Sequence, residues 1–336
     1  MTKQQFRIAS IGLGWWSDVL ADAVNRSSNQ LKIVSCYTRS PDKREIFSQK
    51  YKCANANSYQ EILDDPNIDG IINTTPNHVH LETTKAAANS GKHIFLDKPI
   101  ANNVWEAKEI TEECKKSGIT LSIGYQRRRE SHFRWIKNQI DTGEFGTLVQ
   151  AEANISRDRE GKFELGHWRY TADGMPGGVM LQIGLHYVDV LTMLLGPIKS
   201  VSGMASQLVL PGDNPDVGTL LMHHENGAIS SLSTSYASAS EYYLLNVYGK
   251  KMSAYYNLFD GLRSLRQNET KQKKIPVDKV DTLLEQLIEW ADAALNNSKV
   301  EVGGESATKS LAVVLAGIKS AKEKRHILVD EIINQS

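Results

Sequence analysis

Strand-like and helix-like segments alternate through the first 124 residues of this 336-residue chain, and this alternation limits its fold more than any other feature. Short apolar runs are followed by turn residues and then by stretches of roughly ten residues with helical spacing. Alternation of this kind predicts βαβ units around a parallel sheet. The expected strands are Phe6–Ile11, Leu31–Tyr37, Ile68–Asn73, His93–Leu96 and Ile119–Ile123.

The pattern changes after Gly124, where strand-like segments follow one another and are joined by turns. Asn226-Gly227, between two such segments, is a strong hairpin signal. Runs of strands of this kind predict an antiparallel sheet in an α+β domain. We therefore expect an α/β domain over residues 1–124 and an α+β domain over residues 125–336, the latter with helices at Ser131–Thr142, Gly178–Leu195, Asp278–Leu295 and Ser306–Lys324.

Composition argues against several classes of function. Lys plus Arg and Asp plus Glu number 39 each, so no excess charge attracts nucleic acid or an anionic membrane. The sequence contains no run of about 18 apolar residues that could span a bilayer. Cys36, Cys53 and Cys114 show no C-x-x-C spacing, which favours a reducing compartment. We expect a cytoplasmic protein without a nucleic-acid or membrane partner.

The first expected strand ends in a glycine-rich loop, Gly12-Leu13-Gly14-Trp15-Trp16-Ser17, which opens a helix. Gly12 permits a tight turn, Gly14 lets the backbone approach a pyrophosphate, and small Ser17 can replace the third glycine of a dinucleotide-binding motif. The N–H groups at the start of the helix then face the phosphates. The loop predicts a Rossmann dinucleotide-binding domain, and the alternative is an ordinary βα turn with two glycines.

The end of the second strand bears on which dinucleotide is bound. Folds that bind NAD usually place an acidic residue there, against the ribose hydroxyls. Here the strand is followed by Thr38, Arg39 and Ser40, with no carboxylate before Asp42. Hydroxyl and guanidinium groups suit a 2′-phosphate, so NADP is favoured over NAD. The alternative is that Arg39 faces solvent and Asp42 turns toward the ribose.

Two further strands end in polar residues at the same edge of the expected sheet. Thr74-Thr75-Pro76-Asn77 follows a central strand and is expected to line the nicotinamide side of the cofactor. Asp97-Lys98-Pro99 places a primary amine outside the carboxyl ends of the strands, where such sheets bind their ligands. Together these motifs predict a nicotinamide-dependent oxidoreductase. His78 and His80 have no third ligand nearby in the sequence, so no metal site is predicted.

The order of these motifs resembles that of the Gfo/Idh/MocA oxidoreductases, named for glucose-fructose oxidoreductase and inositol dehydrogenase. The resemblance covers nearly the whole chain. It includes the glycine loop, Thr74–Asn77 with the two histidines, and Asp97-Lys98-Pro99 in place of the usual Glu-Lys-Pro. It continues through Gly124-Tyr125-Gln126-Arg127-Arg128, Gly143-Glu144-Phe145-Gly146 and Gly177–Asp189, which look like the domain crossover, the turn before the first C-terminal strand and the catalytic helix.

The resemblance implies a Rossmann domain followed by a domain with an open, mostly antiparallel sheet, through which such proteins form homodimers or homotetramers. It implies hydride transfer at a secondary hydroxyl or ketone of a sugar, an inositol or a related cyclic compound. His186 is the implied general acid or base, and Lys98 stabilises developing alkoxide. The expected cofactor contacts are Gly12, Leu13, Gly14, Trp15, Trp16, Thr38, Arg39, Ser40, Thr74, Thr75, Pro76, Asn77, His80, Asp97, Lys98 and Gln126.

Gln182 departs from the family pattern, which has aspartate four residues before the histidine, one helical turn away on the same face. Glutamine offers the substrate only neutral hydrogen bonds. Either His186 is then a weaker base than in relatives with a carboxylate, or Lys98 carries more of the proton transfer. Taken without the resemblance, the apolar neighbours Leu181, Leu185 and Val188 favour a core histidine on an amphipathic helix face over a catalytic one.

Basic residues suggest that the substrate carries an acidic group. Clustered guanidinium groups suit a carboxylate or phosphate. Acidic residues such as Asp158 and Glu160 are interleaved with them, so surface ion pairing is at least an equal alternative. The basic residues are Arg127-Arg128-Arg129, Arg157, Arg159, Lys162 and Arg169, and the expected substrate contacts are Arg128, Gln182, Trp168 and Tyr170, the two aromatics through stacking on a ring.

Two other functions fit the same fold. Some relatives hold NAD permanently and cleave glycosidic bonds through a transient oxidation, in a redox-neutral cycle. A non-catalytic regulator could instead sense a sugar or a dinucleotide. Such a sensor needs no proton-transfer pair, so the presence of both Lys98 and His186 argues against it.

Overall fold

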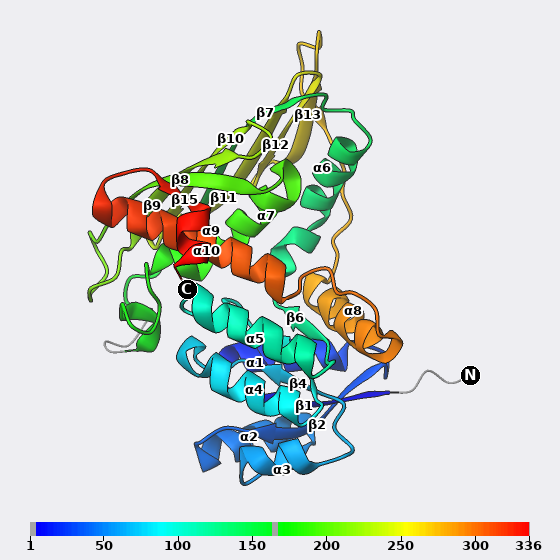
Figure 1. Ribbon diagram of the computed structural model, residues 1–336. Helices are drawn as coiled ribbons and strands as arrows, with labels where there is room; N and C mark the ends of the chain where they lie inside the picture. The colour runs from blue at the N-terminus through cyan, green and yellow to red at the C-terminus, as the bar shows by residue number, and fades with distance from the viewer. Residues whose placement is uncertain (1–4, 163–166, 336) are drawn as a thin grey trace. The chain divides into compact units, whose positions relative to one another are not determined.

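A six-stranded sheet lies at the centre of the first of the two units into which the chain divides (Figure 1). The structure is a computed structural model that describes residues 5–162 and 167–335. The first unit comprises the chain up to Gln126 together with Asp281–Thr308. Its strands lie in the order β3-β2-β1-β4-β5-β6, each parallel to its neighbours. The expected Rossmann-type sheet is therefore confirmed, and its strand order reverses between β1 and β4.

Local sequence explains where several helices of this unit begin. The side chains of Ser40, Ser58 and Asn103 accept backbone N–H groups at the first turns of α2, α3 and α5. The elements of the unit are β1 (Phe6–Ile11), α1 (Trp15–Asn25), β2 (Leu31–Tyr37), α2 (Pro41–Tyr51), β3 (Ala54–Asn55), α3 (Tyr59–Asp64), β4 (Gly70–Asn73), η1 (Asn77–Val79), α4 (His80–Asn89), β5 (His93–Leu96), α5 (Val104–Lys116), β6 (Leu121–Ile123) and α8 (Thr282–Asn296); η2 (Gln126–Arg129) follows at its end.

Helix α8 belongs to the first unit, although the sequence places it within the expected second domain of residues 125–336. Its Trp290 is fully buried and packs edge-on against Phe6 of β1, with ring centroids 5.1 Å apart. The same indole lies 5.9 Å from the ring of Phe95 on β5. Gly70 makes room for it, because a Cβ there would lie 2.8 Å from Trp290 Cζ2. This long-range packing draws the segment 281–308 back to the first unit.

The second unit, Arg127–Val280 with the chain from Lys309 onward, is built on a nine-stranded sheet in the order β14-β13-β12-β11-β7-β10-β9-β8-β15. Its pairs are antiparallel except β7 with β10, which run parallel. The strands are β7 (Leu148–Asp158), β8 (Ile198–Ser206), β9 (Val217–His224), β10 (Ile229–Ser235), β11 (Ala237–Gly249), β12 (Met252–Asn257), β13 (Gly261–Arg266), β14 (Lys273–Lys274) and β15 (Ile327–Leu328). The expected mostly antiparallel sheet is confirmed.

Helices pack on one face of this sheet. Gly317 of α9 lies so close to β8 that a Cβ on Gly203 would be 2.3 Å from its carbonyl oxygen. Met180 packs against Gly218 of β9 in the same way. The helical elements are α6 (Ser131–Asp141), η3 (Trp168–Tyr170), the π-helix η4 (Met180–Gly184), α7 (Leu185–Leu195), α9 (Gly304–Glu323) and α10 (Val329–Asn334).

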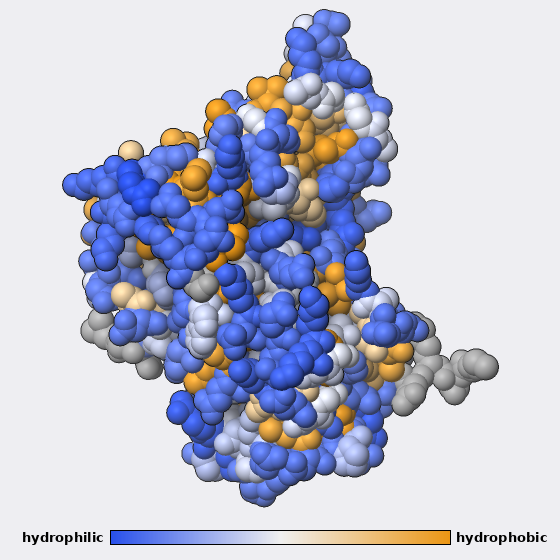
Figure 2. Space-filling model, in the orientation of Figure 1, coloured by the Kyte–Doolittle hydropathy of each residue, from blue (hydrophilic) through white to orange (hydrophobic). Residues whose placement is uncertain are grey.

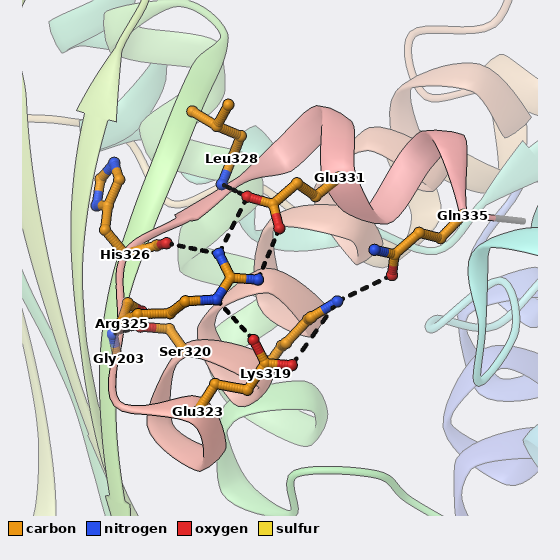
Figure 3. A network of polar contacts seen from close by, with 9 residues as sticks. All are labelled: Gly203, Lys319, Ser320, Glu323, Arg325, His326, Leu328, Glu331 and Gln335. Carbon is orange, nitrogen blue, oxygen red and sulfur yellow. Dashed lines mark hydrogen bonds and ion pairs between the residues drawn. The ribbon is translucent and has the colours of Figure 1, made fainter.

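A polar network holds the C-terminal elements at the β8 edge of the sheet (Figure 3). The Arg325 guanidinium donates to Glu331 on α10 and to Glu323 on α9. The Ser320 hydroxyl accepts the Gly203 N–H at 2.9 Å, which ties α9 to β8. Lys319 of α9 reaches Gln335 at 2.9 Å. These contacts fix α9 and α10 against the short strand β15 that closes the edge.

Candidate functional site

The glycine loop after β1 lies directly against the loop after β4. Gly12 has φ +80°, and its N–H donates to the Tyr37 carbonyl oxygen at 3.1 Å. A Cβ on Gly12 would lie 2.4 Å from the Thr75 nitrogen. The Thr74 hydroxyl bonds the carbonyl oxygens of Ile11 and Gly12 at 3.0 Å each. The two loops therefore meet at the point where the strand order reverses, which is where such sheets bind dinucleotides.

Gly14 caps α1 with an extended backbone, and a Cβ there would meet nothing within 4 Å. The Ser17 hydroxyl accepts the Gly14 N–H at 2.9 Å and donates to the Gly14 carbonyl oxygen at 2.6 Å. Ser17 thus fixes the loop as well as allowing close packing. Open space beside Gly14, at a helix N-terminus, fits the pyrophosphate of a dinucleotide.

Three other side chains of the loop have different surroundings. Leu13 is buried in the core of the first unit, so only its backbone is available to a cofactor. Trp15 is 64% exposed. The Trp16 indole N–H donates to Asp97 Oδ1 at 2.9 Å, and so joins the glycine loop to the segment that carries Lys98.

The loop after β2 presents one exposed cation. Arg39 is exposed, and the described residues form no hydrogen bond or ion pair with its guanidinium. The Ser40 hydroxyl caps α2. Arg44, which the sequence analysis missed, donates to the Thr38 carbonyl oxygen at 2.9 Å and to Asn55 Oδ1 at 3.1 Å. Arg44 therefore holds the loop, while Arg39 faces the solvent.

Polar side chains of the loop after β4 are engaged within the first unit. Asn73 Oδ1 accepts the Thr75 N–H at 3.1 Å and the Thr75 hydroxyl at 2.7 Å. Asn77 is buried, and its amide donates to Asn102 Oδ1 at 3.0 Å. Neither Asn73 nor Asn102 is marked out by its sequence context. These bonds give the loop one conformation beside Gly12.

His80, an expected cofactor contact, bonds instead with protein backbone. It is 1% exposed, with Nδ1 at 3.1 Å from the Pro99 carbonyl oxygen and 3.2 Å from that of Ile100. Its Nε2 lies 2.9 Å from the Thr75 carbonyl oxygen. His80 thus connects the loop after β4 to the residues that follow Lys98, and its role is to position both segments.

The titration of His80 predicts a pH dependence of stability. Burial lowers the pKa of His80 from its ordinary 6.5 to about 4. Between these values the unfolded chain binds a proton that the folded chain does not. The free energy of unfolding therefore falls as the pH is lowered from 6.5 toward 4, with a contribution of about 1.4 kcal/mol per pH unit from this group.

We expect His80→Gln to remove this contribution, which is measured by urea unfolding at several pH values in that window. Exposed His326 of the second unit, replaced in the same way, is the matched control. Equal pH slopes for wild type and His80→Gln would contradict the assignment.

Lys98 follows β5 and is half-buried, and its peptide bond to Pro99 is cis. The N–H of the preceding Asp97 donates to the Asn73 carbonyl oxygen at 2.9 Å. The hydrogen bond from the Trp16 indole holds the Asp97 side chain, so both the backbone and the side chain of Asp97 are fixed. The first unit thus brings the glycine loop, the Thr74–Asn77 loop and Lys98 to one edge of its sheet.

Gln182 and His186 lie in the second unit, where the helix differs from the expected continuous helix over Gly178–Leu195. A π-helix over Met180–Gly184 precedes α7, so Gln182 has π geometry and the assumed α-helical spacing applies only from Leu185 onward. Both side chains are buried, at 8% and 6% exposure. Short π-helical segments occur often at functional sites.

Two glycines with positive φ lead into this segment. Gly177 has φ +74° and a Cβ there would lie 2.1 Å from Ile318 Cδ1. Gly178 has φ +50° and a Cβ there would lie 2.4 Å from the Pro215 carbonyl oxygen. Gly177 lets the chain pass close to α9 and Gly178 lets it pass close to Pro215, just before the helical segment that carries His186.

Arg128, an expected substrate contact, forms a buried pair instead. Its Nε and Nη2 donate to the two carboxylate oxygens of Asp189 at 2.8 and 2.5 Å. The side chains are 11% and 1% exposed. Asp189 lies one helical turn after His186, so its two hydrogen bonds with the Arg128 guanidinium hold α7 in position. The sequence prediction missed this pairing, since Asp189 lies 61 residues away.

The expected aromatic contacts lie in the short helix η3. Trp168 is half-buried, and the Arg169 guanidinium carbon lies 4.4 Å from the centre of its ring. Burial raises the pKa of the Tyr170 phenol, with Tyr236 adding to the shift and Arg159 and Arg169 opposing it. The structure therefore places Tyr170 beside basic residues of the second unit.

The residues present in the first unit fit a nicotinamide dinucleotide. The glycine loop leaves open space at Gly14, and Arg39 is available for the ribose end. Gln126 Oε1 is buried, and no hydrogen bond to it forms within residues 5–162 and 167–335. In the same described ranges no group of three metal-binding side chains occurs, and no helix is both long and apolar enough to cross a membrane.

Family models match both parts of the chain. The model described as an oxidoreductase family with an NAD-binding Rossmann fold matches residues 6–125. The GFO/IDH/MocA C-terminal domain model matches residues 133–255. The first match covers the six-stranded sheet, and the second covers much of the nine-stranded sheet.

Individual proteins show the same likeness. The solved structure of a putative NADPH-dependent oxidoreductase from Desulfitobacterium hafniense is 34% identical, with a TM-score of 0.94 over 98% of this chain and 99% of that one. Myo-inositol 2-dehydrogenase of Thermotoga maritima is 24% identical over 97% of this chain and 99% of its own length. The uncharacterized oxidoreductase YrbE of Bacillus subtilis is 31% identical over 58% of this chain, and the match spans 57% of YrbE. Two oxidoreductases of Schizosaccharomyces pombe are matched over 40% and 45% of their lengths.

Proposed function

The chain belongs to the Gfo/Idh/MocA family of oxidoreductases, and we propose that it transfers hydride between a nicotinamide dinucleotide and a secondary hydroxyl or ketone of a sugar, an inositol or a related cyclic compound. The observation that carries this proposal is the meeting of the loops after β1 and β4, where the strand order of the sheet reverses. There Gly12 and Thr75 are in close approach, Gly14 is open, and Lys98 follows the neighbouring strand β5. The named activity of the Thermotoga relative supports the substrate class.

Side chains of the protein bind the reacting oxygen of the substrate and transfer its proton. A bound nicotinamide supplies the hydride acceptor or donor. His186 takes the proton from the hydroxyl during oxidation and returns it during reduction. The Lys98 ammonium stabilises negative charge that develops on the oxygen. Gln182 adds a neutral hydrogen bond to the substrate, while Arg128 and Asp189 hold the helix that carries His186.

A panel of sugars, inositols and hydroxy acids tests this function. Each compound is incubated with the protein and NADP or NAD, and the absorbance of the reduced nicotinamide is followed. We expect a substrate-dependent rise with at least one cyclic polyol. Dinucleotide binding without turnover on any compound would favour a sensor, and product without net cofactor reduction would favour the redox-neutral cycle.

We further propose NADP as the preferred cofactor and a cytosolic location. The Arg39 guanidinium at the end of β2 and the NADPH-dependent description of the Desulfitobacterium protein support the cofactor. The free thiols of Cys36, Cys53 and Cys114 support a reducing compartment.

Replacing Arg39 with alanine tests the cofactor preference. We expect NADPH to bind about tenfold more weakly, with NADH affinity nearly unchanged, because one charge-assisted bond to the 2′-phosphate is lost. Lys32→Ala, an exposed cation at the opposite end of β2, is the control. Both affinities are measured by calorimetric titration. A wild-type preference for NADH, or equal losses for both dinucleotides, would contradict the assignment.

We propose that the open face of the nine-stranded sheet joins copies of this chain into a homodimer or homotetramer. The helices pack on the other face. Met204, Leu221 and Ile229 are 79%, 53% and 54% exposed on neighbouring strands, and the strand register puts them on one side. Figure 2 shows a mainly hydrophilic surface on which hydrophobic residues also gather at strands of this unit. Hydrophobic residues exposed together on a sheet are typical of a subunit interface.

The double substitution Met204→Lys with Leu221→Lys is expected to dissociate the assembly, because it places buried charges across the interface. Sedimentation velocity measures the mass of wild type and variant. Leu208→Lys, exposed after β8, provides a matched control. A monomeric wild-type protein, or a double variant with unchanged mass, would contradict this interface.

A further inference from the structure

We propose that Trp16 is a positioning residue, which fixes Lys98 relative to the glycine loop through a hydrogen bond to Asp97. This inference rests on the proposed function, in which Lys98 stabilises negative charge on the substrate oxygen. The sequence analysis expected Trp16 to contact the cofactor. In the structure its indole N–H donates to Asp97 Oδ1 at 2.9 Å. The side chain of Trp16 thus acts on a residue 81 positions further along the chain, directly before Lys98.

The bond between Trp16 and Asp97 reaches past a whole strand of the sheet. Trp16 lies in the first turn of α1, after β1, and Asp97 directly follows β5. The strand β4 lies between β1 and β5. Neighbouring strands are about 4.8 Å apart, so β1 and β5 are separated by roughly 10 Å. A long side chain with a donor on its ring, as in tryptophan, can close that distance.

This bond completes a closed set of contacts among the loops after β1, β4 and β5. Gly12, in the loop after β1, lies against Thr75 in the loop after β4. The carbonyl oxygen of Asn73, at the end of β4, accepts the Asp97 N–H at 2.9 Å. The bond from Trp16 then joins the loop after β1 directly to the loop after β5. Each loop is therefore held by both of the others, which limits their relative motion.

The surroundings of the bond strengthen it. Trp16 and Asp97 are both half-buried, and the Trp16 ring packs against the hydrophobic core of the first unit. Gly124 lies against the same carboxylate, since a Cβ there would be 3.4 Å from Asp97 Oδ1. A hydrogen bond to a carboxylate is stronger than one between neutral groups. Because packing fixes the ring, the indole can hold the carboxylate in one place.

The chain on the other side of Lys98 is held as well. His80 Nδ1 lies 3.1 Å from the Pro99 carbonyl oxygen and 3.2 Å from that of Ile100. Lys98 is thus placed between two anchored segments, and Trp16 connects the first of them to the glycine loop. Stabilisation of a developing oxyanion requires a donor that is already in position. Loss of the indole donor should therefore lower kcat.

Trp16→Phe separates this role from that of a cofactor contact, because phenylalanine keeps an aromatic ring but has no N–H donor. The bonds between Ser17 and Gly14 remain, so the glycine loop should keep its conformation. We expect kcat to fall about tenfold, since small misplacements of a catalytic group are costly. The dissociation constant of NADPH should stay within about twofold of the wild-type value, a change of less than about 0.5 kcal/mol.

Steady-state kinetics with the substrate found in the panel and calorimetric titration with NADPH measure the two quantities in the full-length protein. Trp105→Phe is the matched control, because Trp105 is a 52% exposed tryptophan on α5 of the same unit. It should leave kcat and NADPH affinity unchanged. Weaker NADPH binding by Trp16→Phe with unchanged kcat is the result expected of a cofactor contact, and it would overturn the positioning role.

Asp97→Ala provides a second variant, which removes the acceptor and leaves the indole in place. We expect it to lower kcat by at least the same factor as Trp16→Phe. If Trp16 acts through Asp97, adding Trp16→Phe to Asp97→Ala should lower kcat by no more than about a further twofold. Two effects that simply multiply in the double variant would overturn the proposed connection.

Reductive methylation of Lys98 tests the same role without any turnover. The rate of labelling at Lys98 is followed by peptide mass spectrometry in the protein without substrate. We expect it to rise about threefold or more in Trp16→Phe, because a looser segment exposes a half-buried lysine more often. Trp105→Phe should label at the wild-type rate.

The labelling result lets this inference and the proposed function fail separately. Equal labelling of Lys98 in wild type and Trp16→Phe would overturn the role of Trp16, whether or not the protein transfers hydride. Faster labelling in Trp16→Phe, with no hydride transfer by the wild type on any compound, would contradict the proposed function alone.

Discussion

Replacement of Gly12 with alanine is expected to lower dinucleotide affinity by at least about a hundredfold, or roughly 3 kcal/mol. The new Cβ would lie 2.4 Å from the Thr75 nitrogen and 2.6 Å from the Thr74 carbonyl carbon. Both are backbone atoms, so no side chain can swing aside. Gly12 also has φ +80°, which disfavours any residue with a Cβ. The two loops must separate, and the bonds from Thr74 to Ile11 and Gly12 are lost.

Gly14→Ala is the matched control for this substitution. A Cβ on Gly14 meets no protein atom within 4 Å, and its backbone is extended. We expect Gly14→Ala to keep the wild-type melting temperature but to crowd an incoming pyrophosphate, so that affinity falls without loss of stability. Gly12→Ala should lower both the dinucleotide affinity and the melting temperature. NADPH titration and thermal unfolding measure the two effects, and a Gly12→Ala protein with wild-type affinity would contradict the proposal that this loop binds the dinucleotide.

Replacement of His186 or of Lys98 is expected to cause a large fall in kcat. His186→Ala should lower kcat by about 10²–10⁴-fold, the usual contribution of a general acid or base. Lys98→Met should lower kcat by a similar factor of about 10²–10³, because the developing oxyanion loses a charged partner. Dinucleotide affinity should change little in His186→Ala, since the glycine loop and the residues around it lie in the first unit.

Lys250→Ala is the control, because Lys250 is an exposed residue at the turn between β11 and β12, in the same unit as His186. Steady-state kinetics with the substrate found in the panel measures kcat and KM for each variant. A His186→Ala enzyme with near-wild-type kcat would show that this histidine is a core residue. In that case Lys98 would be the main proton-transfer group.

The sequence predicted those features whose signals are local. Strand and helix periodicity, with capping residues such as Ser40 and Ser58, is enough to locate the parallel sheet of the first unit. Two glycines between a strand and a helix are enough to locate the loop after β1. The position of Lys98 directly after β5 is predicted in the same way, because that strand ends in a short and distinct motif.

The features that the sequence did not predict depend on contacts between distant residues. Trp290 packs on Phe6 across nearly the whole chain, and this brings α8 to the first unit. Asp189 takes the guanidinium of Arg128, which the sequence analysis assigned to substrate. The parallel pairing of β7 with β10 is equally long-range. The π-helix before His186 has the same apolar pattern as an α-helix, so periodicity alone does not distinguish the two.

Transfer of deuterium from the carbinol carbon of a substrate to the dinucleotide tests the central claim most directly. The protein is incubated with a polyol deuterated at that carbon and with oxidised cofactor, and both products are analysed by mass spectrometry. The account predicts one deuterium in the nicotinamide for each ketone formed, with the rate of formation of both lowered by about a hundredfold or more in Lys98→Met and His186→Ala. A product formed without deuterium in the released dinucleotide would contradict it.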